Sequence, residues 1–188
     1  HVGRISHVSL LPEGSVPVSS TARRANGKTF TRKGFEDGSA PRALRLEEMP
    51  RIVADYRHAA RCAMQAGFDG VEVHGANGYL LEQFLRDSIN DRTDSYGGSI
   101  ENRSRLLLEG MQAAVSEIGA GRTGARLSPV TPANDAGQDS DAAALYGHVV
   151  DRLAPMQVAY LHLIEGATGG PRDAVPFDFE ALRRRFKQ

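Results

Sequence analysis

Three side chains that can exchange protons or hydrogen bonds with a ligand lie close together in the sequence. His74, Asn77 and Tyr79 bring an imidazole, a carboxamide and a phenol, and only glycine and alanine separate them. Small residues allow a tight turn, so the three polar groups can converge on one ligand. The alternative is structural: Asn77 builds the turn, His74 ends a strand and Tyr79 packs on the next helix. The spacing alone leaves both interpretations open.

A second polar strand end is predicted around Arg126. Successive side chains of a strand point to opposite faces. If Val73 and Leu127 face covering helices, then Glu72, His74 and Arg126 point to the inner face of the sheet. A charged group there is costly unless it is paired or bound to a ligand, so we expect partners for Glu72 and Arg126. The opposite phase, with Arg126 in solvent, stays open.

Alternating strands and helices position these residues. Strand patterns cover 1–7, 68–74, 123–128 and 158–164, and helical patterns cover 46–67, 79–87, 99–118, 139–156 and 177–188. The stretch 11–43 has no clear period and is predicted to be an excursion loop. Strand–helix alternation is typical of a parallel α/β fold, in which ligands bind beyond the carboxyl ends of the strands. The pattern alone fits an open doubly wound sheet or part of a (β/α)8 barrel.

Composition excludes several classes of protein. The 188 residues carry 23 Lys and Arg against 23 Asp and Glu, so no net field attracts nucleic acid or an anionic membrane surface. No apolar run approaches the roughly 20 residues that span a bilayer. The single cysteine, Cys62, excludes an internal disulfide, and no H-x-x-x-H pair is present. We therefore expect no nucleic acid, no membrane and no metal as partners.

Two long motifs carry a resemblance to a known family. They are residues 68–87 (Phe-Asp-Gly-Val-Glu-Val-His-Gly-Ala-Asn-Gly-Tyr-Leu-Leu-Glu-Gln-Phe-Leu-Arg-Asp) and residues 90–103 (Asn-Asp-Arg-Thr-Asp-Ser-Tyr-Gly-Gly-Ser-Ile-Glu-Asn-Arg). Both closely resemble the Old Yellow Enzyme family of flavin-dependent ene-reductases. Shorter matches fall in family order at 1–7, 40–44, 126–129 and 160–163. The likeness covers almost the whole chain.

The resemblance implies a fold and a set of site residues. Family members are eight-stranded βα barrels that bind FMN at the carboxyl ends of the strands. We therefore expect an α/β fold, a partial (β/α)8 TIM barrel whose four or so βα units correspond to strands three to six. His74 and Asn77 match the pair that binds the substrate's carbonyl or nitro oxygen, and Tyr79 matches the proton donor. Arg126, with His74, is expected to bind the cofactor, and Asn134 is expected to reach the substrate pocket.

The implied chemistry suits these residue types. Reduced flavin delivers a hydride to the β-carbon of an activated alkene, and two preorganised donors stabilise the charge that develops on the electron-withdrawing group. A phenol is protonated at neutral pH and can give its proton to the α-carbon. A permanently cationic arginine favours an anionic reduced flavin. The expected activity is FMN-dependent reduction of enones, enals and nitroalkenes, with NADPH or NADH as reductant.

Other interpretations remain beside this one. Within the family the chain could belong to a dienoyl-thioester reductase or an amine dehydrogenase; outside it, to a non-catalytic half-barrel without flavin. Family residues that grip the flavin ring and phosphate have no counterpart here. We therefore expect residues 1–188 to form one incomplete barrel domain, with the 11–43 loop near the active site. Alone, without the remainder of the barrel, it should be inactive and hold FMN weakly.

Two further expectations concern the setting of the protein. A cytoplasmic location is expected, although the chain opens at His1 rather than at a methionine, so a targeting signal stays open. The sequence also leaves open whether the protein is a homo-oligomer.

Overall fold

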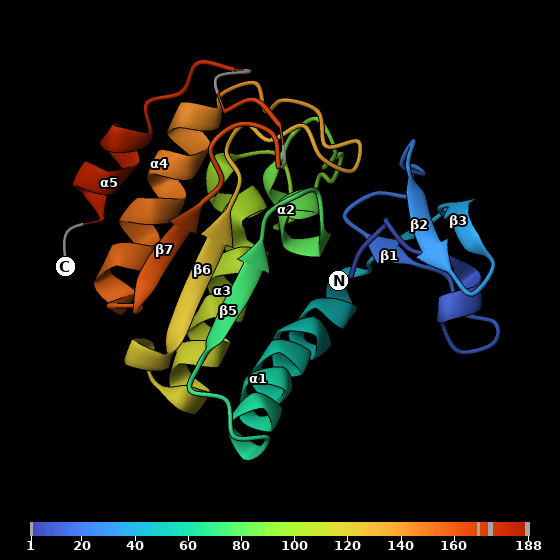
Figure 1. Ribbon diagram of the computed structural model, residues 1–188, viewed down its shortest axis with the longest axis horizontal. Coiled ribbons are helices and arrows are strands. Elements are labelled where there is room, and N and C mark those ends of the chain that lie inside the picture. Colours follow the sequence, from blue (N-terminus) through green and yellow to red (C-terminus); the bar gives the residue numbers. More distant parts are fainter. Residues whose placement is uncertain (1, 169, 173–174, 187–188) are drawn as a thin grey trace.

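A three-stranded parallel sheet forms the centre of the computed structural model, which describes residues 2–168, 170–172 and 175–186 (Figure 1). Its strands lie in the order β5 (Val71–Gly75), β6 (Thr123–Leu127) and β7 (Tyr160–Leu163). Helix α3 (Ile100–Ile118) connects β5 to β6 and lies behind them in Figure 1. Helix α4 (Ala142–Leu153) connects β6 to β7. The predicted strand–helix alternation is confirmed for these strands.

The remaining helices also lie where their apolar periods predict them. They are α1 (Met49–Gln65), α2 (Leu80–Leu85) and α5 (Phe179–Arg185). Single 3-10 turns occur at Val8–Leu10, Leu46–Glu48, Ala120–Arg122 and Ala154–Met156. Residues 187–188 of the helix predicted at 177–188 lie outside the described residues. Within the described ranges, no helix has both the length and the apolarity needed to cross a membrane.

The strand predicted at 1–7 is wrong for residues 2–7, and residue 1 lies outside the described part of the chain. The Val2 carbonyl accepts a hydrogen bond from the Leu80 amide (2.9 Å), and the Arg4 amide donates to Gln83 Oε1 (3.1 Å). A strand needs the backbone of a neighbouring strand alongside it. Here Val2 and Arg4 bond to residues of α2 instead, and the Ser6 carbonyl accepts from the Ser39 amide (2.9 Å).

The excursion predicted at 11–43 contains two small sheets rather than loop alone. Strand β1 (Val18–Ser19) pairs in parallel with β4 (Arg42–Ala43), while β2 (Lys28–Thr31) and β3 (Gly34–Asp37) form an antiparallel hairpin. The hairpin lies to the side of the central sheet, beyond α2 (Figure 1). The rings of Phe30 and Phe35 meet across it, edge to face, with centroids 5.2 Å apart. This cross-strand pair stabilises strands of only four residues each.

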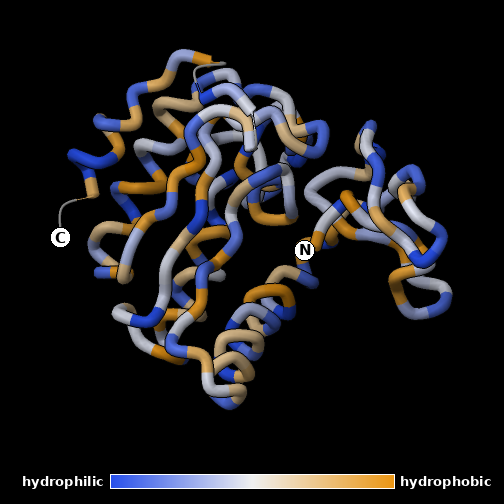
Figure 2. Tube along the Cα trace, viewed as in Figure 1, coloured by the Kyte–Doolittle hydropathy of each residue, from blue (hydrophilic) through white to orange (hydrophobic). Residues whose placement is uncertain are grey.

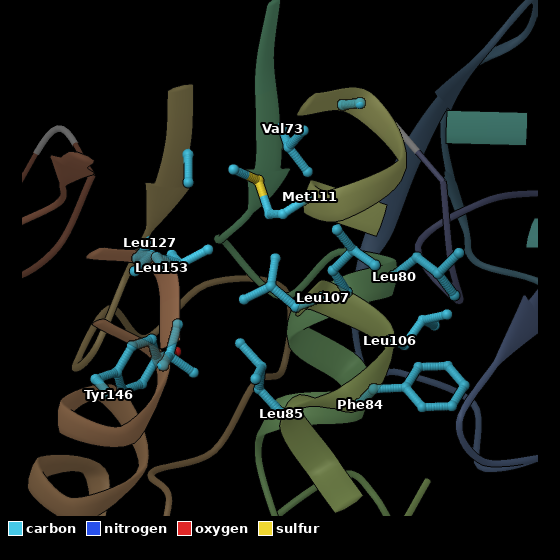
Figure 3. Packing of buried hydrophobic residues seen from close by; sticks show 14 of the residues in the cluster. Val73, Leu80, Phe84, Leu85, Leu106, Leu107, Met111, Leu127, Tyr146 and Leu153 are labelled. Atoms are coloured by element: carbon cyan, nitrogen blue, oxygen red, sulfur yellow. The ribbon is translucent and has the colours of Figure 1, made fainter. Parts of the chain in front are cut away.

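The hydrophobic core lies between the sheet and helices α2, α3 and α4 (Figure 3). Hydrophobic and hydrophilic residues alternate along the three strands (Figure 2). Val73, Ala125 and Leu127 are buried against the helices. The strand phase assumed in the sequence analysis is therefore confirmed, and it leaves His74 and Arg126 on the opposite face. Each fully buried aliphatic side chain stabilises the fold by about 1.5 to 3 kcal/mol.

Candidate active site

One row of polar side chains crosses the inner face of the sheet at its carboxyl end. His74 lies opposite Arg126 in the register of β5 and β6, and Arg126 lies opposite His162 of β7. Glu72 lies two residues before His74 on the same face of β5. Its Oε2 lies 3.1 Å from His162 Nδ1, so Glu72 has the expected partner. Parallel strands end together, so these groups and the loops that follow them share one rim of the sheet.

The turn after β5 carries the three residues proposed from spacing. His74, Asn77 and Tyr79 are half-buried, whereas the glycine and alanine residues between them are fully buried. The rings of His74 and Tyr79 lie side by side, with centroids 5.2 Å apart and planes 56° apart. The structure therefore brings the imidazole and the phenol together at the end of β5, with Asn77 in the turn between them.

Asn77 has an unusual backbone conformation for a residue other than glycine. Its φ is +56°, and Gly78 follows with φ +71°. The Asn77 amide donates to Ser128 Oγ (2.8 Å), and its side-chain oxygen accepts from Thr168 Oγ1 (3.2 Å). The bond to Thr168 fixes which side of the carboxamide carries the oxygen, and the NH2 group on the other side is the donor that Asn77 offers to a ligand.

His74 is held in its neutral form. Burial lowers the pKa of this imidazole below its usual 6.5, and the positive charge of Arg126 lowers it further, while Glu72 opposes the change. At neutral pH the ring therefore has one N–H donor and one acceptor nitrogen. A neutral imidazole can donate to a ligand oxygen without placing a second cation beside Arg126.

Arg126 lies in a polar cavity of about 540 Å³ that also borders His162, Thr168 and Arg172. Its Nε is buried and has no hydrogen-bond partner among the described residues. A buried donor in this position suits a ligand with oxygen or nitrogen acceptors. A second cavity, of about 250 Å³, is lined by His74 and Tyr79 together with mainly apolar neighbours.

Asn134 lies beside Asn77. It has φ +54°, and its side-chain Nδ2 donates to the Asn77 carbonyl (2.7 Å). Its side chain thus supports the turn that carries Asn77. Contact between Asn134 and a substrate stays a prediction.

Sequence reasoning missed the support beneath the turn. Glu82 of α2 and Arg86, the residue after α2, are fully buried and form an ion pair (3.0 Å) that also involves Ser128. One signal was available in the sequence. Two opposite charges four residues apart, within the mostly apolar run Leu-Leu-Glu-Gln-Phe-Leu-Arg, indicate a buried pair when the helix is buried on all sides. No comparable signal points to Thr168.

In the described part of the chain, no three His, Cys, Asp or Glu side chains gather as metal ligands.

Comparisons with known proteins agree with this architecture. Residues 1–183 match the model of the NADH:flavin oxidoreductase / NADH oxidase family. The chain is 46% identical to 12-oxophytodienoate reductase 2 of Arabidopsis thaliana over 195 residues, which covers 100% of the chain and 50% of that protein. It is 48% identical to 12-oxophytodienoate reductase 1 of Oryza sativa subsp. japonica over 170 residues, covering 88% of the chain and 42% of that protein.

Solved structures give the same result. The old yellow enzyme homologue of Zymomonas mobilis superimposes with a TM-score of 0.91 at 37% identity, covering 100% of this chain and 52% of that one. Morphinone reductase superimposes with a TM-score of 0.90 at 41% identity, covering 99% and 51%, and one of its structures is a complex with tetrahydroNAD.

The fold is therefore a partial (β/α)8 barrel with a polar site at the carboxyl ends of its strands, as predicted. The chain belongs to the NADH:flavin oxidoreductase / NADH oxidase family, which includes the Old Yellow Enzymes. It spans about half the length of the relatives it matches.

Proposed function

We propose that this chain supplies the substrate side of the active site of an FMN-dependent reductase of activated C=C bonds. The substrates are enones, enals or nitroalkenes, and NADPH or NADH is the reductant. One observation carries the proposal: His74, Asn77 and Tyr79 are half-buried around a single turn at the carboxyl end of β5, beside Arg126. The names of the relatives, 12-oxophytodienoate reductase and morphinone reductase, support a reductase.

The residues around Arg126 fit a flavin. A guanidinium with a buried, unpartnered Nε among the described residues, next to a cavity of about 540 Å³, suits the oxygen and nitrogen acceptors of an isoalloxazine ring. The fixed positive charge of Arg126 favours the negative charge of the reduced ring. When bound and reduced, FMN supplies the hydride.

His74 and Asn77 then act as hydrogen-bond donors. Negative charge grows on the carbonyl or nitro oxygen of the substrate as the alkene is reduced. The neutral imidazole N–H and the Asn77 NH2 stabilise that charge as an oxyanion hole does. Because the turn fixes both groups before the substrate arrives, little reorganisation is needed during the reaction.

Tyr79 completes the reduction by giving its phenolic proton to the α-carbon of the substrate. The test is Tyr79→Phe in the FMN-loaded enzyme with the complete barrel, with each half-reaction followed by stopped-flow absorbance. We expect the alkene-dependent step to slow by about 10²- to 10⁴-fold, the usual contribution of a positioned proton donor. Flavin reduction by the nicotinamide should keep its rate. Equal slowing of both steps, or no slowing of the alkene step, contradicts the assignment.

A matched control is Tyr96→Phe. This buried phenol donates to Glu109 Oε2 of α3 (2.8 Å), away from the turn after β5. Its loss removes one hydroxyl from the same kind of residue without touching the proposed site. Both half-reactions should therefore keep their rates.

A further inference from the structure

A buried carboxylate lies directly beneath the turn that carries the proposed catalytic groups. Glu82 of α2 is fully buried and accepts four hydrogen bonds. Its Oε2 accepts from the Gly78 amide (2.6 Å). Its Oε1 accepts from Arg86 (3.0 Å), Ser128 Oγ (2.6 Å) and the hydroxyl of Tyr146 (2.6 Å). The carboxylate thus links the turn after β5, the first residue after β6, the end of α2 and helix α4 at one point.

Stability alone does not account for this arrangement. A buried ion pair is often no better for stability than apolar side chains of the same volume. Burial of Glu82 and Arg86 is tolerated because the two side chains pair with each other and make further hydrogen bonds. Arg86 also donates to the carbonyls of Ser128 (2.5 Å) and Gly137 (2.8 Å), while its buried Nε has no partner among the described residues. Burial, reinforced by Glu82, raises the pKa of Tyr146 well above its usual value, so its hydroxyl stays protonated and donates.

The hydrogen bonds of Glu82 act on the backbone around Asn77. Asn77 and Gly78 both have positive φ, so the chain makes a left-handed turn at these two residues. The Gly78 amide binds Glu82 directly, and the Asn77 amide binds Ser128 Oγ, which donates to Glu82 in turn. The carboxylate therefore satisfies the Gly78 amide directly and orients Ser128 Oγ for the Asn77 amide, which helps to hold Asn77 in a conformation that residues other than glycine seldom adopt.

We propose that Glu82 is a positioning residue for the reaction. It fixes the left-handed Asn77–Gly78 turn and thereby aims the Asn77 carboxamide and the Tyr79 phenol at the substrate. Glu82 itself contacts the turn and not the substrate. The inference rests on the proposed function, because it assigns Asn77 and Tyr79 to the alkene-reducing step.

The test is Glu82→Gln, which keeps the size of the side chain but replaces one acceptor oxygen by an NH2 group. It leaves the Gly78 amide or the hydroxyl donors without a matching acceptor. In the FMN-loaded enzyme with the complete barrel, we expect the alkene-dependent step to slow by about 10- to 100-fold, as for a misplaced reacting group. Flavin reduction should be unchanged. Hydrogen–deuterium exchange at the amides of Asn77 and Gly78 should become faster.

Glu109→Gln is the matched control, because Glu109 also accepts from a tyrosine hydroxyl but lies on α3 away from the turn. It should change neither half-reaction. If Glu82→Gln does not fold, Ser128→Ala keeps the carboxylate but removes the hydroxyl that accepts from the Asn77 amide and donates to Glu82, and it should also slow the alkene step.

Two results would overturn the proposal. One is faster exchange at Asn77 and Gly78 with an unchanged alkene step. The other is equal slowing of both half-reactions, which indicates a merely structural role. Failure of the proposed function can be told apart from failure of this inference. If the proposed function is wrong, Tyr79→Phe leaves the alkene step unchanged, while hydrogen–deuterium exchange in Glu82→Gln still shows whether Glu82 holds the turn.

Discussion

Gly78→Ala tests the geometry of the turn most directly. Gly78 has φ +71°, which costs a residue with a Cβ about 1 to 2 kcal/mol. A Cβ at this position would lie 2.6 Å from the Ala133 carbonyl oxygen and 3.0 Å from Asn134 Cβ. A Cβ essentially never comes within 3.0 Å of a non-bonded heavy atom outside its own residue and chain neighbours, so the loop after β6 must shift away. Such overpacking costs about 1 to 3 kcal/mol more.

We therefore expect Gly78→Ala to lower the free energy of unfolding by about 2 to 5 kcal/mol in urea titrations. The retreat also pulls Asn134 away from the Asn77 carbonyl, which it now binds at 2.7 Å. The alkene-dependent step should consequently slow by about 10- to 100-fold, and flavin reduction should be affected less.

Gly67→Ala separates the cost of a positive φ from the cost of the steric clash. Gly67 ends α1 with φ +86°, and a Cβ there would have nothing within 4 Å. Gly67→Ala should lower the free energy of unfolding only by the cost of a positive φ, about 1 to 2 kcal/mol, and leave both half-reactions unchanged. Equal destabilisation by the two variants would refute the clash, and an unchanged alkene step in Gly78→Ala would refute the link between this turn and catalysis.

Two further predictions concern stability. Because burial and Arg126 hold the pKa of His74 below 6.5, the folded state binds fewer protons than the unfolded one at acidic pH. The free energy of unfolding should then fall as the pH drops below about 6.5, and His74→Gln should flatten that part of a urea-titration series. Leu107→Ala leaves a cavity in the fully buried core and should cost about 2 to 5 kcal/mol with both half-reactions intact; a loss under about 1 kcal/mol would mean that the core collapses around it.

The longer helices and the central strands were predictable because their burial repeats along the chain. Helix α3 has an apolar face that recurs every three or four residues, and its start was marked by Ser99, which accepts a hydrogen bond from the Asn102 amide. The alternation in β5 and β6 also gave the correct face for His74 and Arg126.

Pairing between distant segments was not predictable in the same way. The segment 2–7 has a strand-like composition, yet its backbone bonds to α2, and no local pattern records which neighbour a backbone group will meet. The hairpin within 11–43 has strands too short for a clear period. Glu82 meets Ser128 and Tyr146 from 46 and 64 residues away, and such contacts leave no periodic trace.

The buried pair Glu82–Arg86 also bears on how this scaffold could be redesigned. Glu82 holds the turn after β5, while Arg86 donates to the carbonyls of Ser128, Thr131 and Gly137 in the segment between β6 and α4. The two loops therefore form one module, although more than forty residues separate them along the chain. A chimera that imports either loop alone from a relative would break the shared anchor, so loop grafting for new substrates should exchange residues 75–90 and 128–141 together.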